Sequence, residues 1–278
     1  MDILRYGAFT DRPDGGNPAG VVLDARGLDD AAMLRVAADV GYSETAFATA
    51  DGLPAGTHRL RYFSPRAEVD FCGHATVATA VALAERSAPG RLTFLTNAGQ
   101  VDIATAADAG AVTATFTTVP ASSTPAAPDD VDAALRALHW SATDLDPGFP
   151  PHVAYAGAHH LVLAAATRER LADLAYDVDA LGALCHARGW TTVHLFHRAS
   201  DTLFHARDPF PVGGVVEDPA TGAAGAAFGA YLRGLGKVAA GTPFTVRQGE
   251  DMGRPSVLTV TPLADGRVSV TGRAVPLD

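Results

Sequence analysis

The sequence contains very little cysteine. Only two of its 278 residues are cysteines, Cys72 and Cys185. This number is too small for the disulfide framework that stabilises many small secreted proteins. Cys185 falls on the apolar face of an expected helix, so we expect its thiol to be buried in the core. Cys72 lies in a polar turn, so a role as a buried core residue accounts for its presence less well than it does for Cys185.

Long uncharged runs and clusters of basic residues are missing as well. No apolar run is both long and free of polar or glycine breaks, which argues against a membrane-spanning helix. Residues 1–6 are typical of a β-strand and not of a signal peptide, so we expect a cytosolic protein. The net charge is −10 with no basic cluster, which argues against nucleic acid and anionic membranes as partners.

Apolar residues, in contrast, are plentiful. Hydrophobic residues make up 47% of the chain and charged residues 19%. A chain of this length and composition is expected to be a soluble globular protein with two modest domains or one large one.

Two stretches combine a polar turn with a long uncharged segment, one over residues 70–84 and one over residues 217–232. A helix that is apolar on all sides has no solvent face, so each should be enclosed by other structure. The first turn of such a helix carries unpaired N–H groups and the positive end of the helix dipole, which suits an anion. We interpret the two stretches as equivalent buried helices, one per lobe, whose N-termini face a shared cleft.

Most of the remaining pattern indicates short strands. Strands that surround one central helix in each half predict a duplicated α+β architecture and not an alternating βαβ one. We expect an N-terminal lobe of residues 1–118 with 272–278 and a C-terminal lobe of residues 129–271. The tract between them, 119–128, is rich in Pro, Ala, Ser and Thr and is expected to be a linker.

The glycine and histidine patterns do not indicate a cofactor or a metal. Gly222, Gly225 and Gly229 are not spaced as in a dinucleotide fingerprint and do not open a βαβ unit. The ten histidines show no metal-ligand spacing, and the adjacent His159 and His160 would point to opposite sides of a strand. We expect most histidines to be solvated or structural.

Three polar residues each have two explanations. Glu44, between Ser43 and Thr45, is either a solvated acid at a strand end or a carboxylate drawn partly out of water for proton transfer. His74 is either a helix cap or a catalytic group, and an Asp before Pro, as at Asp218, is commonly structural. Their combination beside two anion-binding helix ends favours proton-transfer chemistry.

Six motifs follow one another along nearly the whole chain: Gly16–Ala19, Ser43–Thr45, Phe63–Pro65 with Glu68, Cys72–Thr76, Glu217–Gly222, and Gln248–Gly249 with Met252–Ser256. Together they resemble the phenazine-biosynthesis PhzF-like family, within the diaminopimelate-epimerase fold superfamily. The resemblance implies two similar lobes, each a strongly curved, mainly antiparallel sheet wrapped around a central helix. It also implies cofactor-independent proton shuttling in a site between the lobes.

The resemblance assigns roles to individual residues. Glu44 would be the general acid/base, with His74 and Asp218 as the assisting polar pair. The backbone groups of Gly73 and Gly222 would hold the carboxylate of the substrate. Further substrate contacts are expected from Asn17, Ser43, Cys72 and Ala223.

The resemblance further implies a homodimeric isomerase of secondary metabolism that acts on a small unsaturated carboxylate or amino-acid-derived metabolite. The family's phenazine enzyme has Ser at the position of Ala223, so this chain lacks a hydroxyl that could bind the phenazine intermediate. Two alternatives stay open. One is an epimerase or racemase of an amino acid, which usually needs a Cys at each helix mouth. The other is a non-catalytic protein that binds a small molecule in the same cleft.

Overall fold

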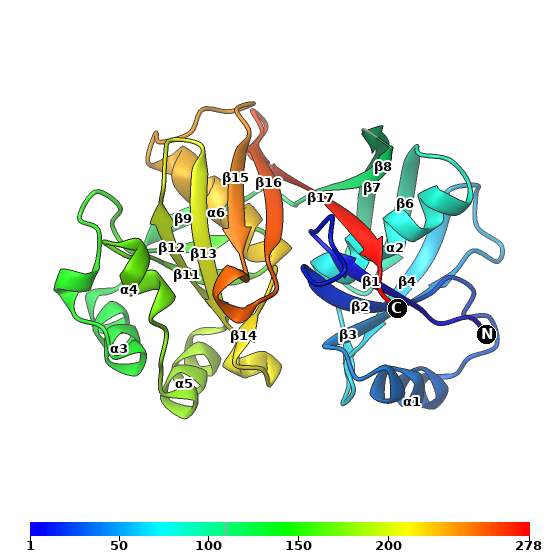
Figure 1. The fold of residues 1–278 in the computed structure, drawn as a ribbon, viewed down its shortest axis with the longest axis horizontal. Helices are drawn as coiled ribbons and strands as arrows, with labels where there is room; N and C mark the ends of the chain where they lie inside the picture. Colours follow the sequence, from blue (N-terminus) through cyan, green and yellow to red (C-terminus); the bar gives the residue numbers. More distant parts are fainter. Residues whose placement is uncertain (109) are drawn as a thin grey trace. The chain divides into compact units, whose positions relative to one another are not determined.

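The computed structural model describes residues 1–108 and 110–278. Contacts within the chain divide it into two compact units. Unit 1 comprises Met1–Thr117 and Thr271–Asp278, and unit 2 comprises Thr118–Val270. Each unit has one central helix with strands around it, α2 in unit 1 and α6 in unit 2 (Figure 1).

The strands of unit 1 close into a barrel. β1 pairs with both β2 and β17, and β17 also pairs with β8. The neighbouring pairs β2–β3, β3–β4, β4–β6, β6–β7 and β7–β8 complete the circuit. The strands are β1 (Leu4–Ala8), β2 (Asn17–Val22), β3 (Glu44–Thr49), β4 (Thr57–Phe63), β5 (Glu68–Val69), β6 (Arg91–Thr96), β7 (Gly99–Asp108), β8 (Ala111–Thr117) and the end of β17 (Val268–Pro276).

Helix α2 (Gly73–Arg86) fills the barrel, and its residues from His74 to Ala82 are all buried. Helix α1 (Asp30–Val40) lies outside and packs Met33 and Ala37 against the sheet. The side chain of Asp29 caps α1 by accepting from the amide of Ala32 at 2.7 Å, a contact that Asp commonly makes at this position. The two helices connect the two parallel pairs, β2–β3 and β4–β6, because parallel neighbours need a crossover.

Unit 2 repeats this topology. The short strand β14 pairs antiparallel with β13, α6 follows, and β15 then pairs parallel with β13; in unit 1 the strands β4, β5 and β6 relate to α2 in the same way. The strands of unit 2 are β9 (Ser122–Pro125), β10 (His152–Tyr155), β11 (His159–Ala164), β12 (Trp190–Arg198), β13 (Leu203–Pro209), β14 (Glu217–Asp218), β15 (Phe244–Gln248), β16 (Ser256–Pro262) and the start of β17.

Helix α6 (Gly222–Gly234) is the central helix of unit 2 and contacts β9, β10, β11, β12 and β16. Phe228 and Tyr231 extend from it into an aromatic core, where the Phe228 ring lies 4.5 Å from that of Phe196 and 5.1 Å from that of Phe204. Helices α3 (Pro128–Leu138), α4 (Arg168–Ala172) and α5 (Val178–Arg188) form a separate outer layer around Cys185 and its apolar neighbours. The prediction of two buried, uncharged helices is therefore confirmed, as is the burial of the Cys185 thiol.

The expected linker is in part a strand. β9 lies within residues 119–128 and pairs antiparallel with β10, with Ser123 opposite Ala154. The Pro-rich composition was misleading because Pro125 is the last residue of β9, where a missing backbone N–H costs little, and the strand still pairs with β10. The short strands β5 and β14 were also missing from the expected pattern, since two residues carry no periodicity. Among the described residues, no helix is both long and apolar enough to span a membrane.

Two glycines of α6 offer a test of how tightly this helix is enclosed. A Cβ at Gly229 would lie 2.9 Å from Val268 Cγ1 and 3.0 Å from Val260 Cγ1, whereas one at Gly225 would lie 3.4 Å from Leu258 Cδ2. We expect Gly229→Ala to lower the free energy of unfolding by about 1–3 kcal/mol through overpacking. Gly225→Ala should be neutral or stabilising, because Ala favours helix by up to about 1 kcal/mol. Urea denaturation of both variants checks this, and equal midpoints would contradict it.

Candidate active site

Three predicted residues of unit 1 converge at the start of α2. Glu44 Oε2 lies 3.4 Å from His74 Nε2 and 3.6 Å from Cys72 Sγ. Cys72 Sγ in turn lies 3.3 Å from His74 Nδ1. The side chain of Glu44 is 15% exposed and that of His74 is 6% exposed. The functional explanation of Glu44 is therefore geometrically possible, because its carboxylate is drawn partly out of water beside two other reactive groups.

Local structure explains this convergence. Glu44 is the first residue of β3, paired with Ala19 of β2, while Cys72 is the N-cap of α2. The helix start is anchored by Thr76, whose hydroxyl donates to the carbonyl of Cys72 at 2.7 Å. The same hydroxyl lies 2.6 Å from the buried hydroxyl of Tyr62. The N-terminus of α2 is thus tied to β4, which pairs with β3.

Burial determines the charge of His74. It lowers the pKa of His74 below its ordinary value, and the Glu44 carboxylate and a backbone hydrogen bond only partly oppose this. The ring is therefore neutral near pH 7. The amide nitrogen of Asn17 lies 3.1 Å from Nδ1 and can donate to it. In that arrangement Nε2 carries the proton and points to Glu44 and to Ser43 Oγ, which lies at 3.4 Å.

The remaining predicted residues of unit 1 lie in the same cluster. Asn17 begins β2 and is buried, Ser43 immediately precedes β3, and Gly73 is the first residue of α2. The first amides of α2 have no partner within the helix, as at any α-helix start. All six residues predicted in this half of the site are thus brought together at one end of the barrel helix.

In unit 2 the predicted residue Asp218 lies in a tightly bonded turn before α6. Its Oδ2 accepts from Thr221 Oγ1 at 2.6 Å. Gln248, which is buried, bridges the turn: its Nε2 donates to the carbonyl of Asp218 at 2.7 Å, and its Oε1 accepts from the amide of Thr221 at 3.0 Å. Gln248 belongs to one of the motifs, but sequence reasoning gave it no role at the site.

A neighbouring glycine explains why the motif continues after Gln248. Gly249 has a φ of +73°, and a Cβ there would lie 2.3 Å from the carbonyl oxygen of Arg254 and 2.7 Å from that of Pro219. Only glycine fits this conformation and this close approach. Gly222 is the first residue of α6 and is buried, with the half-buried Ala223 after it. Asp218, Gly222 and Ala223 therefore lie together in unit 2.

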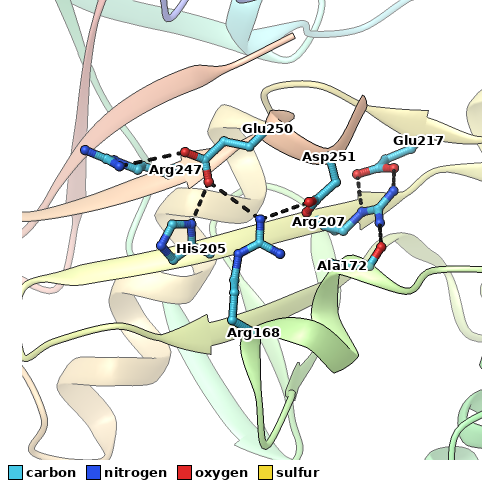
Figure 2. A network of polar contacts seen from close by, with 8 residues as sticks. All are labelled: Arg168, Ala172, His205, Arg207, Glu217, Arg247, Glu250 and Asp251. Carbon is cyan, nitrogen blue, oxygen red and sulfur yellow. Dashed lines mark hydrogen bonds and ion pairs between the residues drawn. The ribbon is translucent and has the colours of Figure 1, made fainter. Parts of the chain in front are cut away.

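A polar network includes Glu217, the residue that precedes this turn (Figure 2). Arg207 of β13 makes a two-pronged ion pair with Glu217, the residue before Asp218, and both side chains are almost fully buried. A third nitrogen of Arg207 donates to the carbonyl of Ala172 at 2.6 Å. Figure 2 also shows Glu250 with His205, Arg168 and Arg247, and Asp251 with Arg168. Sequence reasoning missed Arg207, because nothing in the sequence pairs it with Glu217.

The two groups of predicted residues thus each form a cluster within one unit. Unit 1 contains Glu44 and His74, and unit 2 contains Asp218. That the two helix N-termini face a shared cleft stays a prediction.

Sequence reasoning also missed a buried polar chain in unit 2. Asp208, which is fully buried, accepts from Thr192 Oγ1 at 2.9 Å, and its carboxylate lies 3.1 Å from His194 Nδ1. The hydroxyl of Thr192 also lies 2.8 Å from Nδ1 of the buried His160. Asp208 pairs across the strands with Asp218. The expectation of structural histidines agrees with the buried, hydrogen-bonded positions of His160 and His194. The acidic partner of His194 is Asp208, which lies fourteen residues further on, in the next strand.

His160 predicts a pH dependence of stability. Burial lowers the pKa of His160 to about 4, whereas the unfolded value is about 6.5. Between these values the unfolded chain binds a proton that the folded chain does not. The contribution of the neutral His160 to stability is therefore fully present above about pH 6.5 and is lost as the pH falls towards 4.

We expect His160→Asn to reduce the pH slope of the unfolding free energy by about 1.4 kcal/mol per pH unit in this window. The neighbouring, exposed His159 supplies the matched control, His159→Asn. Urea denaturation at pH 4.5, 5.5 and 6.5 measures the slopes. Equal slopes for the two variants would contradict this assignment.

Comparison with known proteins adds the family. The family model described as phenazine biosynthesis-like protein, PhzC–PhzF, matches residues 6–278. The chain belongs to the PhzF family. Within it, an uncharacterized isomerase of Deinococcus radiodurans is 36% identical over 263 residues, covering 91% of this chain and 84% of that protein. The trans-2,3-dihydro-3-hydroxyanthranilate isomerase of Pseudomonas fluorescens is 30% identical, covering 96% of this chain and 94% of that protein.

Solved structures agree with this family and its fold. A PhzF-family protein of Bacillus anthracis has a TM-score of 0.88 at 26% identity, covering 100% of this chain and 98% of that one. A hydroxyproline epimerase of Agrobacterium vitis has a TM-score of 0.66 at 14% identity, covering 99% of this chain and 90% of that one, and shows a shared fold alone. The sheet-rich α/β structure of this PhzF-family chain is therefore that of the epimerase and racemase fold, and its named relatives are isomerases.

Proposed function

We propose that this chain is a cofactor-independent isomerase that moves a proton between carbons of a small unsaturated carboxylate or amino-acid-derived metabolite. Glu44 is the general acid/base, with His74 and Asp218 as assisting polar groups. The observation that carries the proposal is the contact of the Glu44 carboxylate with the neutral His74 ring and the Cys72 thiol at the start of α2. Membership of the PhzF family supports it.

In the proposed mechanism Glu44 removes a proton from a carbon next to a double bond. The electron pair of that C–H bond shifts into the conjugated system, and the negative charge that develops spreads towards the substrate carboxylate. Amides at the first turns of α2 and α6, including those of Gly73 and Gly222, stabilise that charge as preorganised donors. Glu44 then delivers a proton to the far carbon of the system, and in D₂O the O–H proton of its carboxyl exchanges with solvent, so that deuterium enters at carbon. The reaction needs no oxidant and no reductant.

The neutral state of His74 suits this mechanism. A protonated imidazolium 3.4 Å from Glu44 would hold the carboxylate as an ion pair and weaken it as a base. Because burial lowers the pKa of His74, the ring can donate a hydrogen bond from Nε2 without adding a full charge. Asp218 is held by Thr221 and, through its backbone, by Gln248, which suits a positioned polar group.

The substrate is proposed to differ from that of the Pseudomonas fluorescens relative, whose name specifies trans-2,3-dihydro-3-hydroxyanthranilate. Ala223 offers a methyl group in the first turn of α6 where the phenazine enzyme has a hydroxyl. A substrate with an apolar group next to Ala223 fits this chain better. A polar substrate group at that point would be buried without a hydrogen-bond partner, which costs free energy.

The two-thiol epimerase is the weaker alternative. Of the two cysteines, Cys185 belongs to α5, lies in the apolar cluster that α5 shares with α3, and is fully buried. Burial also raises the pKa of its thiol to about 11, so it is not a thiolate near neutral pH. Only Cys72 is placed for chemistry, and a single thiol would need a partner of another kind on the opposite face of the substrate carbon.

Proton exchange in D₂O tests the proposal. A panel of unsaturated cyclic amino and hydroxy acids is incubated with the wild type and with Glu44→Gln, and deuterium at carbon is followed by NMR and mass spectrometry. Exchange with the wild type alone supports the isomerase and the role of Glu44. Binding without exchange across the panel would favour a binding protein, and a loss in Cys72→Ser as deep as in Glu44→Gln would favour thiol chemistry.

A further inference from the structure

We propose that Glu44, Cys72 and His74 form a binding site for a thiophilic divalent cation, with Zn²⁺ as the fitting ion, and that its occupation blocks Glu44. A carboxylate oxygen, a thiol sulfur and an imidazole nitrogen from these residues all lie within 4.8 Å of one another. The site adds a metal-dependent inhibition to the proposed function, and the inhibitory part rests on that function. The binding part does not.

The distances between the donor atoms match a face of a zinc coordination tetrahedron. Zn²⁺ binds sulfur at about 2.3 Å and nitrogen or oxygen at about 2.0–2.2 Å, so neighbouring donors in a tetrahedron lie about 3.3–3.6 Å apart. Here Cys72 Sγ is 3.6 Å from Glu44 Oε2 and 3.7 Å from His74 Nε2, and these two atoms are 3.4 Å apart. The three atoms can therefore contact one ion with little movement.

The chemistry of the donors also favours zinc. Thiolate, imidazole and carboxylate are its three common protein ligands, and three protein ligands with an open fourth position describe a site accessible to water or substrate. Cys72 caps α2, and the positive end of the helix dipole stabilises a negative charge at that position. All three side chains are buried or half-buried. Glu44 is held by the start of β3, and Cys72 and His74 are held by the start of α2.

Coordination through Nε2 requires the proton of His74 to lie on Nδ1. The amide nitrogen of Asn17 lies 3.1 Å from that nitrogen. Metal binding therefore requires the Asn17 amide to turn over, so that its oxygen faces Nδ1 and accepts the proton. A hydrogen bond of this kind fixes the ring tautomer for metal binding, as the outer ligands of zinc sites commonly do. The lone pair of Glu44 that would take the substrate proton is then held by the ion, so proton transfer stops.

The test uses the full chain without an affinity tag, after chelation and buffer exchange. Zn²⁺ binding is measured by competition with a chromophoric chelator, and Co²⁺ is used as a spectroscopic probe. We expect one equivalent of metal ion to bind per chain, and we expect the Co²⁺ form to show a thiolate-to-cobalt charge-transfer absorption band. Cys72→Ser should weaken binding at least about 10-fold, since even the loss of an outer-shell partner commonly costs 10–100-fold. Cys185→Ser, which removes the other cysteine, should bind as the wild type does.

The outcomes separate binding from function. No binding, no thiolate band in the wild type, or equal weakening in both cysteine variants would overturn the site, and the wild-type spectrum needs no variant to fold. Inhibition is tested as the rate of proton exchange with Zn²⁺ relative to each protein's own metal-free rate. Zinc that binds without slowing exchange would overturn the inhibition. An absence of exchange in all proteins would count against the proposed function and leave the binding result standing.

Discussion

Glu44→Gln is expected to lower kcat/KM for proton exchange by about 10²–10⁴-fold, the range that a positioned acid/base contributes. The amide is close to the carboxylate in shape and can still accept from the thiol of Cys72 and from His74. It cannot take up a proton from carbon at neutral pH. Folding and substrate affinity should therefore change little, so that the loss falls on kcat and not on KM.

The matched control for this prediction is Glu85→Gln. Glu85 lies near the other end of α2 and accepts from the hydroxyl of Tyr6 at 2.6 Å, which a glutamine oxygen can also do. Steady-state exchange rates, thermal unfolding and ligand binding are compared for the wild type and both variants. Near-normal exchange by Glu44→Gln would remove Glu44 from the role of acid/base. An equal loss in Glu85→Gln would show that the effect is not specific to the site.

Among the variants proposed in this chain, Arg207→Met is expected to lower the free energy of unfolding most, by about 3–5 kcal/mol. The two-pronged ion pair of Arg207 and Glu217 is almost fully buried, with side chains 10% and 5% exposed. Removal of the guanidinium leaves the Glu217 carboxylate buried without its counter-charge and the carbonyl of Ala172 without its donor. The unfolding free energy is measured by urea denaturation.

Two further variants identify the cause of that loss. Arg207→Met combined with Glu217→Leu should recover a large part of the stability, because an apolar pair of similar volume replaces a buried charge pair at little net cost. Arg26→Met removes an exposed arginine that pairs with Asp24 and Asp51, and it should change the denaturation midpoint little. If the double variant is as unstable as Arg207→Met, packing of the arginine and not its charge pair stabilises this region.

Much of the architecture could be predicted from local patterns. The uncharged runs after Gly73 and Gly222 form the two central helices, because helices without a polar face must be enclosed. The burial of Cys185 was likewise predictable, since it depends on apolar residues a few positions away on the same helix. The strand β9 was not, because its formation depends on pairing with β10, far along the chain.

The residues of the candidate site could also be predicted only where their signals are local in the sequence. Glu44, His74 and Asp218 could be selected from the sequence because motifs and helix starts are local features. Sequence alone also determined the lack of a second thiol placed for chemistry, since Cys185 belongs to an apolar helix face. The sequence has no metal-ligand spacing signature, because the three donors of the proposed metal site come from two segments of the chain.

Tertiary structure alone decided which groups meet. Cys72 and His74 are separated by one residue, but Glu44 reaches them only because β3 and the start of α2 lie side by side in unit 1. Arg207 finds Glu217, and His194 finds Asp208, across antiparallel strands whose pairing no short window of sequence encodes. The physical reason is that a buried charge is tolerated only with its partner in contact, and strand pairing brings those partners together only when the chain folds.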